Sequence, residues 1–317
     1  MRVRILYHDH CFDGAASAAF FSRFVEEKFY PGAEFAYTGL AHKASQLFEP
    51  GQFDGDVNAI VDFKYSTDPR LTWWFDHHQS AFLSPEDAEH FRLNPNAYKF
   101  FDPAYRSCTK YIAAVAREKF GFDPADLAEL VIWADIVDGA LYRDAQQAVD
   151  LDSPAAQLTL VIESAPDSDT VQNIIRMMRQ RPLGAIAADP QIEGLFKPLY
   201  QRHLKTIDII RRQSTCRAGV VCFDLVDDGL EGYNKFIPYY LFPESLYTVS
   251  VSTSAFRTKV SVGSNPWARA PLKYNLATIC ERYGGGGHPG VGAISFEVGA
   301  IDRARQVARE IAAELGS

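Results

Sequence analysis

The sequence predicts an α/β protein with a parallel-sheet N-terminal domain, a smaller C-terminal α/β domain and a cleft between them. First, 317 residues are more than one hydrophobic core normally organises, which indicates about two domains. Second, short apolar runs alternate with helical patterns over residues 1–140, as in proteins built from βα units. Third, strand patterns return after Arg217, beyond a long stretch that is helical throughout.

In the N-terminal domain, short apolar runs predict strands, and apolar residues spaced three or four apart predict helices. The expected strands are Val3–Tyr7, Glu34–Thr38, Val57–Val61 and Leu71–Phe75, and the expected helices are Ala15–Phe29, 106–120 and 124–137. Asp123-Pro124 is a start signal for the last of these helices. Strands that alternate with helices in this way indicate a parallel sheet.

The remainder of the chain is first helical and then returns to strands. The pattern over 153–212 is helical, with breaks at Pro182 and Pro190. Strands are expected at Ala218–Val226, Leu246–Ser252, Lys259–Gly263 and 291–298, and helices at 273–283 and 302–315, with the run Gly284–Gly287 between them. We therefore expect a first domain at 1–190, a helical connector at 191–215 and a second domain at 216–317.

Composition indicates a globular protein of a reducing compartment, for which the cytoplasm is the expected location. Apolar residues make up 47% and charged residues 23% of the chain, and no apolar run is long enough to cross a membrane. The five cysteines are odd in number and form no Cys-x-x-Cys pair, and the chain starts with a strand pattern instead of a signal peptide. A net charge of −8 disfavours binding to long nucleic-acid duplexes.

One segment of this acidic chain is basic. Between residues 251 and 290 the only acidic residue is Glu281, whereas the segment contains five basic residues, namely Arg257, Lys259, Arg269, Lys273 and Arg282. This segment is either a local site for an anion or a solvated basic face.

Polar side chains that can bind metals follow three of the expected strands. His8 ends the first strand, Asp62 follows Val57–Val61, and Asp76-His77-His78 follows the run that begins at Leu71. Ligands bind at the carboxyl edge of open parallel sheets, so these side chains should converge there. Nitrogen and oxygen ligands together suit Mn²⁺, with Zn²⁺ or iron as alternatives. Asp62 taken alone would more simply be a helix cap or turn former.

Asp76-His77-His78 and Gly284–Gly287-His288, together with His8, Asp13-Gly14 and Asp62, resemble the DHH phosphoesterase family with its DHHA1 C-terminal domain. This superfamily includes RecJ-like and nanoRNA-degrading phosphodiesterases, and the resemblance covers nearly the whole chain. It implies that 1–190 is the metal-binding catalytic DHH domain and that 216–317 is the substrate-binding DHHA1 domain.

The resemblance also implies a pair of divalent metal ions, most commonly Mn²⁺, and a role for each motif residue. His8 would bind the first metal, Asp13 and His77 the second, and Asp62 both. A further aspartate ligand is expected from a downstream helix, where Asp138 is favoured over Asp135.

Two residues have implied roles in catalysis rather than in metal binding. His78 would face the scissile phosphate as an electrostatic or acid catalyst. Asp76 would hold a histidine in the required tautomer.

The first motif departs from the commonest family pattern. It resembles the variant His-x-x-Cys-x-Asp-Gly, in which Cys11 stands where an aspartate is usual. A thiol must lose a proton to bind a metal well, so the first metal could be bound more weakly or with a different selectivity. Asp9 or His10 could compensate, or Cys11 could be a small buried residue without a ligand role.

The second domain is expected to bind substrate. The glycines leave backbone N–H groups open to a phosphate, and basic residues would grip phosphates that are not cut. The expected residues are Gly285, Gly286, Gly287, His288, Arg257, Lys259 and Arg269. Trp267 either stacks on a base or belongs to the core.

Together these features predict a cytoplasmic, Mn²⁺-dependent phosphodiesterase that cleaves a short oligonucleotide or a linear or cyclic dinucleotide with a metal-activated water. A phosphomonoesterase acting on bisphosphorylated nucleotides is the alternative enzyme, and inorganic pyrophosphatases that are related lack the glycine-histidine loop. A catalytically weakened nucleotide-binding protein is the alternative outside the enzymes, because of Cys11. A homodimer is left open.

Overall fold

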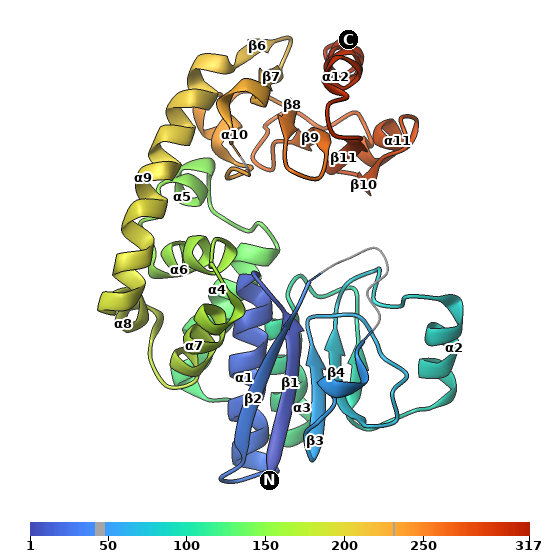
Figure 1. The fold of residues 1–317 in the computed structure, drawn as a ribbon, viewed down its shortest axis with the longest axis vertical. Helices are drawn as coiled ribbons and strands as arrows, with labels where there is room; N and C mark the ends of the chain where they lie inside the picture. Colours follow the sequence, from blue (N-terminus) through green and yellow to red (C-terminus); the bar gives the residue numbers. More distant parts are fainter. Residues whose placement is uncertain (42–47, 231) are drawn as a thin grey trace. The chain divides into compact units, whose positions relative to one another are not determined.

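The computed structural model describes residues 1–41, 48–230 and 232–317 (Figure 1). The chain divides into two compact units, one formed by Met1–Leu141 with Asp152–Leu199 and the other by Tyr142–Leu151 with Tyr200–Ser317. The boundary between the two units, after Leu199, lies within helix α9 (Pro190–Gln213). This helix also includes most of 191–215, the segment expected to be a connector. The functional boundaries at 190 and 216 stay predictions.

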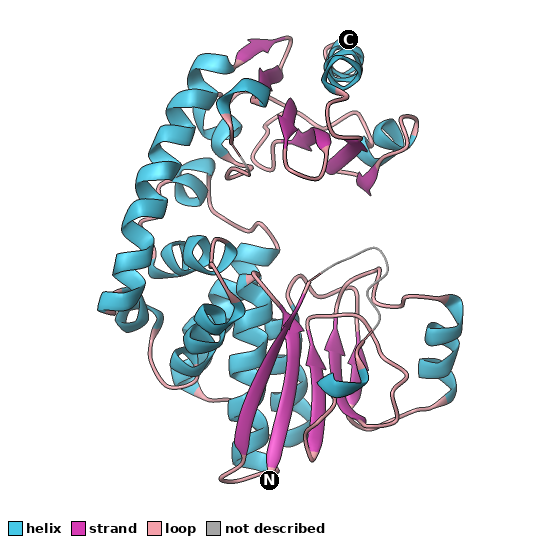
Figure 2. Cartoon of the chain, in the orientation of Figure 1, coloured by secondary structure: helices cyan, strands magenta, loops and turns pink. Residues whose placement is uncertain are grey.

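The first unit contains a parallel sheet, as the sequence predicts, and the sheet has a fifth strand beyond the four expected (Figure 2). In the order β2-β1-β3-β4-β5 its strands are β2 (Glu34–Leu40), β1 (Arg2–His8), β3 (Val57–Val61), β4 (Leu71–Asp76) and β5 (Lys99–Phe101). Alternate residues of β1 belong to two cores, since Ile5 lies in one buried cluster and Leu6 in another. A sheet covered on both faces explains why its strands read as apolar runs.

Helices cover this sheet and extend the unit. They are α1 (Phe12–Lys28), α2 (Pro85–Leu93), α3 (Cys108–Phe120), α4 (Ala128–Asp138), α6 (Pro154–Glu163), α7 (Ser168–Met178), α8 (Leu183–Ala187) and the first part of α9. Short 3₁₀ turns lie at Pro50–Gln52 and Ala125–Leu127. Helix α1 starts three residues before the predicted Ala15, so Asp13 lies in its first turn.

The second unit contains a six-stranded mixed sheet in the order β10-β11-β9-β8-β7-β6. The strands are β6 (Thr215–Arg217), β7 (Val220–Asp224), β8 (Tyr247–Thr253), β9 (Thr258–Ser264), β10 (Gly286–His288) and β11 (Val291–Phe296). The helices are α5 (Ala145–Val149), α10 (Ile237–Leu241), α11 (Leu276–Glu281), α12 (Ile301–Leu315) and the second part of α9, with a 3₁₀ turn at Val226–Asp228. Among the strand pairs described in this sheet, only β7 and β8 run in parallel.

Two predictions about the second unit need correction. The end of the glycine run is an edge strand, β10, which pairs with β11 and was expected to be a loop. Helix α11 is shorter than the expected 273–283 because Asn275 caps its start by accepting hydrogen bonds from the N–H groups of Ala277 and Thr278. Across the described ranges, no helix combines the length and apolar character that a membrane crossing requires.

Candidate metal centre

The structure brings together the polar residues that follow strands β1, β3 and β4. These strands are neighbours in the parallel sheet, so their carboxyl ends lie at one edge. His8 is the last residue of β1, Asp62 follows β3, and Asp76 is the last residue of β4. We refer to the side chains gathered at this edge as the carboxylate–histidine cluster, which comprises His8, Cys11, Asp13, Asp62, His77, His78 and Asp138.

Asp62 lies at the centre of this cluster. Its side chain is only 1% exposed, and neither carboxylate oxygen has a hydrogen-bond partner within the part of the chain that the structure describes. His77 Nε2 lies 3.3 Å from Oδ1, and His8 Nδ1 lies 3.5 Å from Oδ2. The backbone of Asp62 has a φ of +56°, in the left-handed region that few non-glycine residues adopt. A buried carboxylate without hydrogen bonds requires a cation nearby, and strained backbone is common at functional sites.

The candidate ligands among the described residues form three overlapping groups, one of which is Asp62, His77 and His78. His8, Cys11 and Asp62 offer ligand atoms that all lie within 4.8 Å of one another. Asp13, His77 and Asp138 do the same, and His77 Nε2 lies 3.8 Å from Asp13 Oδ2 and 3.5 Å from Asp138 Oδ2. Because Asp62 Oδ1 approaches His77 and Oδ2 approaches His8, its two oxygens face different groups. The residues therefore fit a pair of divalent ions that share one carboxylate.

The tautomer of His77 is set by a backbone carbonyl. His77 Nδ1 lies 3.1 Å from the carbonyl oxygen of Tyr105, which can only accept a hydrogen bond. Nδ1 must therefore carry the proton, and the lone pair of the neutral ring is on Nε2, the atom that faces Asp13, Asp62 and Asp138. Such an outer hydrogen bond is typical of histidines that bind metals.

Asp76 organises both histidines of its motif. Its Oδ1 accepts hydrogen bonds from the backbone N–H groups of His77 at 2.8 Å and His78 at 3.2 Å, and it lies 2.7 Å from His78 Nδ1. Burial alone would lower the pKa of His78, but the hydrogen bond to Asp76 and the charge of Asp62 raise that pKa to about 9. In the metal-free protein this raised pKa favours the protonated ring of His78, and Asp76 holds that ring in place.

Asp13 joins the cluster to the start of helix α3. Its carboxylate accepts hydrogen bonds from the N–H groups of Cys108 at 2.6 Å and Thr109 at 3.1 Å, and from the Thr109 hydroxyl at 2.6 Å. Gly14 allows this arrangement, because a Cβ there would lie 2.1 Å from the carbonyl oxygen of His8. Thus Asp13-Gly14 is required both for charge at the cluster and for close contact between β1 and α1.

The electrostatics show that the cluster attracts positive charge. Burial and the charges of Asp62 and Asp138 raise the pKa of Asp13 well above its usual value. Burial alone would lower the pKa of His77, but the three carboxylates outweigh it and raise that pKa to about 10. Burial also acts to raise the pKa of Asp62, yet the imidazoles of His77 and His8 hold it well below its usual range. In the metal-free protein, a proton on His77 supplies the positive charge.

Cys11 occupies the residue before helix α1, where its side chain makes no capping hydrogen bond, and it lies in the group with His8 and Asp62. Burial, followed by the nearby carboxylates, raises the pKa of its thiol well above the usual value, so the metal-free protein holds it as a neutral thiol. Asp9, which was considered as a substitute ligand, instead accepts hydrogen bonds from the Ser168 and Tyr7 hydroxyls. His10 Nδ1 lies 3.3 Å from Asp9, and neither residue belongs to the described cluster.

The two candidate aspartates of helix α4 have different surroundings. Asp138 lies in the cluster beside His77. Asp135 lies one helical turn earlier and forms an ion pair with Lys110 at 2.5 Å. Lys110 therefore neutralises Asp135, which is not part of the described cluster, whereas Asp138 faces that cluster.

The residues expected to bind substrate all belong to the second unit. Lys259 on β9 pairs in register with Ser295 on β11, and Arg257 Nη1 donates a hydrogen bond of 2.9 Å to the Ser295 hydroxyl. Burial and then the charge of Arg257 lower the pKa of Lys259. Arg269 lies exposed in the segment between β9 and α11. Trp267 is half-buried, donates a hydrogen bond to the Tyr142 carbonyl and packs edge-on against Phe236, and the choice between stacking and core stays a prediction.

Two of the glycines have a packing role in addition to any binding role. A Cβ at Gly285 would lie 2.3 Å from the carbonyl oxygen of Ala293, and a Cβ at Gly287 would lie 2.2 Å from that of Val291. Gly286 faces open space on the edge strand β10. Close packing alone therefore explains part of the glycine run, and substrate binding by Gly285–His288 stays a prediction.

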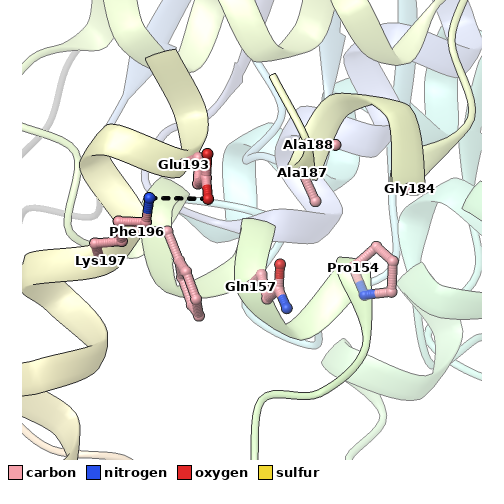
Figure 3. Close-up of a pocket in the computed structure, with 8 residues that line it drawn as sticks. All are labelled: Pro154, Gln157, Gly184, Ala187, Ala188, Glu193, Phe196 and Lys197. Carbon is pink, nitrogen blue, oxygen red and sulfur yellow. Dashed lines mark ion pairs between the residues drawn. The ribbon is translucent and has the colours of Figure 1, made fainter. Parts of the chain in front are cut away.

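A pocket of about 430 Å³ lies elsewhere in the first unit, among helices α6, α8 and α9 (Figure 3). Glu193 and Lys197 on its wall form an ion pair of 2.9 Å, and Phe196 and Pro154 contribute apolar surface. None of the residues predicted from the sequence lines it.

The chain was compared with family models, curated proteins and solved structures. No family model and no curated protein matches. Among solved structures, PggH from Vibrio cholerae, a pGpG-specific phosphodiesterase, matches over 99% of both chains with a TM-score of 0.71 and 15% identity. A DHH domain of a protein described as a member of the s1p family of ribosomal proteins covers the whole chain, with 88% of its own length matched, a TM-score of 0.54 and 14% identity. The chain has the DHH/DHHA1 phosphoesterase fold.

Within the DHH/DHHA1 fold, a longer protein is also similar. RecJ from Thermus thermophilus in complex with Mn²⁺ matches 99% of this chain with a TM-score of 0.56 and 12% identity. The match spans about half of RecJ, or 52% of its length. These identities are low, so the similarity concerns the fold, and the chemistry must be argued from the residues of this chain.

Sequence reasoning missed three contributors around the cluster. Tyr105 contributes through a backbone carbonyl, which leaves no trace in the side-chain pattern. Thr109 contributes through a hydroxyl and an N–H group at the start of α3. Arg106 lies between them in the chain, and its side chain passes beside Gly139, which follows Asp138. The Ser107-Cys108-Thr109 helix start, with Ser107 as the cap, was the one signal that could have directed attention here.

Proposed function

We propose that this chain is a metal-dependent phosphoesterase, and more specifically a phosphodiesterase that acts on short oligonucleotides or on linear or cyclic dinucleotides. The observation that carries the proposal is Asp62, a buried carboxylate without hydrogen bonds among the described residues, whose two oxygens face different groups of candidate ligands. The fold supports it, because PggH is a pGpG-specific phosphodiesterase and RecJ was solved with Mn²⁺.

The cluster can hold two divalent ions, for which we propose Mn²⁺. His8, Asp62 and Cys11 would hold one ion, and Asp13, Asp62, His77 and Asp138 the other. Such a pair, when bound, activates water as a nucleophile and neutralises phosphate oxygens. Because the pKa of His77 is about 10 without metal, metal binding must displace a proton from its Nε2.

The protein groups around the ions orient substrate and supply charge. Asp76 fixes the ring of His78, so His78 in its protonated form can stabilise negative charge on the scissile phosphate or donate a proton to the leaving group. Asp76 acts through His78 and is a positioning residue. In the second unit, we propose that Arg257, Lys259 and the Gly285–His288 segment bind the parts of the nucleotide that are not cut.

A panel of substrates tests the proposal. The purified protein with Mn²⁺ should hydrolyse dinucleotides, cyclic dinucleotides or five-nucleotide oligomers faster than a 3′,5′-bisphosphate nucleotide or pyrophosphate. Preference for the bisphosphate nucleotide would support a phosphomonoesterase instead. No hydrolysis by the wild type, combined with equal nucleotide binding by Asp62→Ala, would rule out the enzyme.

A second candidate function, nucleotide binding without turnover, is favoured by one observation. The neutral thiol of Cys11 is a weaker ligand than the carboxylate usual at this position. Metal content after native purification separates the two, since two ions per chain support the enzyme and fewer ions without turnover support the binding protein. All five cysteines are free, which agrees with the reducing cytoplasm proposed as the location.

A further inference from the structure

Arg106 is anchored at the candidate metal centre by both of its neighbours. The carbonyl of Tyr105 accepts the hydrogen bond from His77 Nδ1. Ser107 caps helix α3 by accepting a hydrogen bond of 3.2 Å from the N–H group of Lys110. Because the chain is held on either side of Arg106, its backbone lies at a defined place beside the cluster, although its side chain is exposed.

The stem of Arg106 runs along the end of helix α4. A Cβ placed on Gly139 would lie 3.1 Å from Arg106 Cβ and 3.2 Å from its Cδ. Gly139 directly follows Asp138, a candidate ligand whose side chain is 28% exposed. The side chain of Arg106 therefore passes beside the residue that follows Asp138, and it is exposed to solvent there.

The charge of Arg106 is not neutralised within the described residues. No ion pair or side-chain hydrogen bond is found there for its guanidinium, whereas Lys110, four residues later, is paired with Asp135 at 2.5 Å. The four carboxylates of Asp13, Asp62, Asp76 and Asp138 would offset the four positive charges of two divalent ions. A dinucleotide with a terminal phosphate carries about three negative charges, because the terminal group alone contributes roughly 1.5 to 2. Further cations are needed to neutralise the charge of such a substrate, and Arg106 lies in a suitable position.

We propose that Arg106 binds a substrate phosphate other than the one that is hydrolysed. This inference rests on the proposed phosphodiesterase function and adds a residue of the first unit to those expected to hold substrate. Phosphate is the chemistry that fits, because a guanidinium presents paired donors that match phosphate oxygens. Arg106 would thereby place the scissile bond against the metals without taking part in its cleavage.

The test compares Arg106→Gln with Arg117→Gln, using a 5′-phosphorylated dinucleotide and the same dinucleotide without that phosphate. Arg117 is a matched control, since it lies on helix α3, is 60% exposed and is far along that helix from the cluster residues. For the phosphorylated substrate, Arg106→Gln should raise KM about tenfold to a hundredfold, the range for a lost charge-assisted hydrogen bond, and change kcat less than about threefold. Arg106→Lys should recover part of the loss, and the control should match the wild type.

Three results would overturn the inference. They are an unchanged KM in Arg106→Gln, an equal rise in KM for the substrate that lacks the terminal phosphate, and loss of bound Mn²⁺ in the variant. Calorimetric binding of the phosphorylated dinucleotide in Ca²⁺ is measured in parallel. If the wild type binds but never hydrolyses it, the proposed function fails while the role of Arg106 is still decided by the variant's affinity. If the wild type does not bind it either, both fail.

Discussion

Replacing Asp62 with asparagine tests the centre of the site, because the change removes a charge and keeps the shape. The Asp62 side chain is 1% exposed, and its oxygens lie 3.3 Å and 3.5 Å from His77 and His8. Removing one partner from a buried charge pair costs about 3–5 kcal/mol. About 4 kcal/mol corresponds to roughly a thousandfold loss of affinity for the ions that Asp62 would share. Turnover should fall by at least that factor.

Two measurements follow this change, and one of them needs no metal. Metal content by mass spectrometry after dialysis should fall from two ions per chain to one or none. In the metal-free protein, an NMR titration should show the pKa of His77 falling from about 10 toward its ordinary value, because Asp62 is the largest source of the increase. The second measurement reports the local charge whether or not the protein is an enzyme.

Asp135→Asn is the matched control for this experiment. It removes an aspartate only one helical turn from Asp138, but one that pairs with Lys110 outside the described cluster. The control should keep both metal ions and leave the pKa of His77 near its wild-type value. If Asp62→Asn binds two ions with wild-type affinity, or if the pKa of His77 is unchanged in it, the assignment of Asp62 as a shared ligand is wrong.

His78→Ala should reduce kcat about a hundredfold or more and leave the metal content unchanged, because Asp76 holds His78 as an acid–base group and not as a ligand. Equal loss of metal from His78→Ala and Asp62→Ala would contradict these separate roles. Cys11→Ala should weaken Zn²⁺ binding more than Mn²⁺ binding in competition dialysis, since thiolates favour softer ions; identical shifts would exclude Cys11 as a ligand. Raising the pH from about 6.5 to about 10 should destabilise the metal-free protein. The protonated His77 ring is stabilised by folding, so this contribution to stability is complete below the unfolded pKa and is lost as the pH rises through the folded pKa of about 10. A melting temperature that does not change over this pH range would refute the prediction. Gly14→Ala should destabilise the fold by about 2 kcal/mol or more in urea titrations, since its Cβ would overlap a backbone oxygen. Gly51→Ala should not, since a Cβ there meets no atom of the described residues within 4 Å.

The central strands of the first unit could be predicted, since β1, β3 and β4 are short apolar runs that are largely buried on both faces of the sheet. Strand β5 (Lys99–Phe101) could not, because three half-buried residues leave too short a pattern. Helix α1 starts at Phe12, three residues before the predicted Ala15, so Asp13 and Gly14 belong to its first turn. Asp13 binds the start of α3, which is far from it in the sequence. Gly14 lies against the His8 carbonyl, a contact that depends on the backbone geometry.

The second unit shows a similar limit. The glycine run was expected to be a loop, because glycine is poor at forming strands. Gly285 and Gly287 are required there by the neighbouring carbonyls of β11, a packing constraint that local propensity cannot express. The mixed order of the sheet also depends on pairing between distant segments, such as the parallel pair β7 and β8.

The sequence by itself determined where the polar chemistry lies, because residues that end neighbouring parallel strands must meet at one edge of the sheet. His8, Asp62 and Asp76-His77-His78 could be placed together on that ground alone. Only the tertiary structure decided which aspartate of α4 faces the cluster, since Asp135 and Asp138 are neighbours on one helix and Lys110 pairs with Asp135. It alone also decided the tautomer of His77 and the place of Arg106, because both depend on backbone atoms that carry no sequence signature.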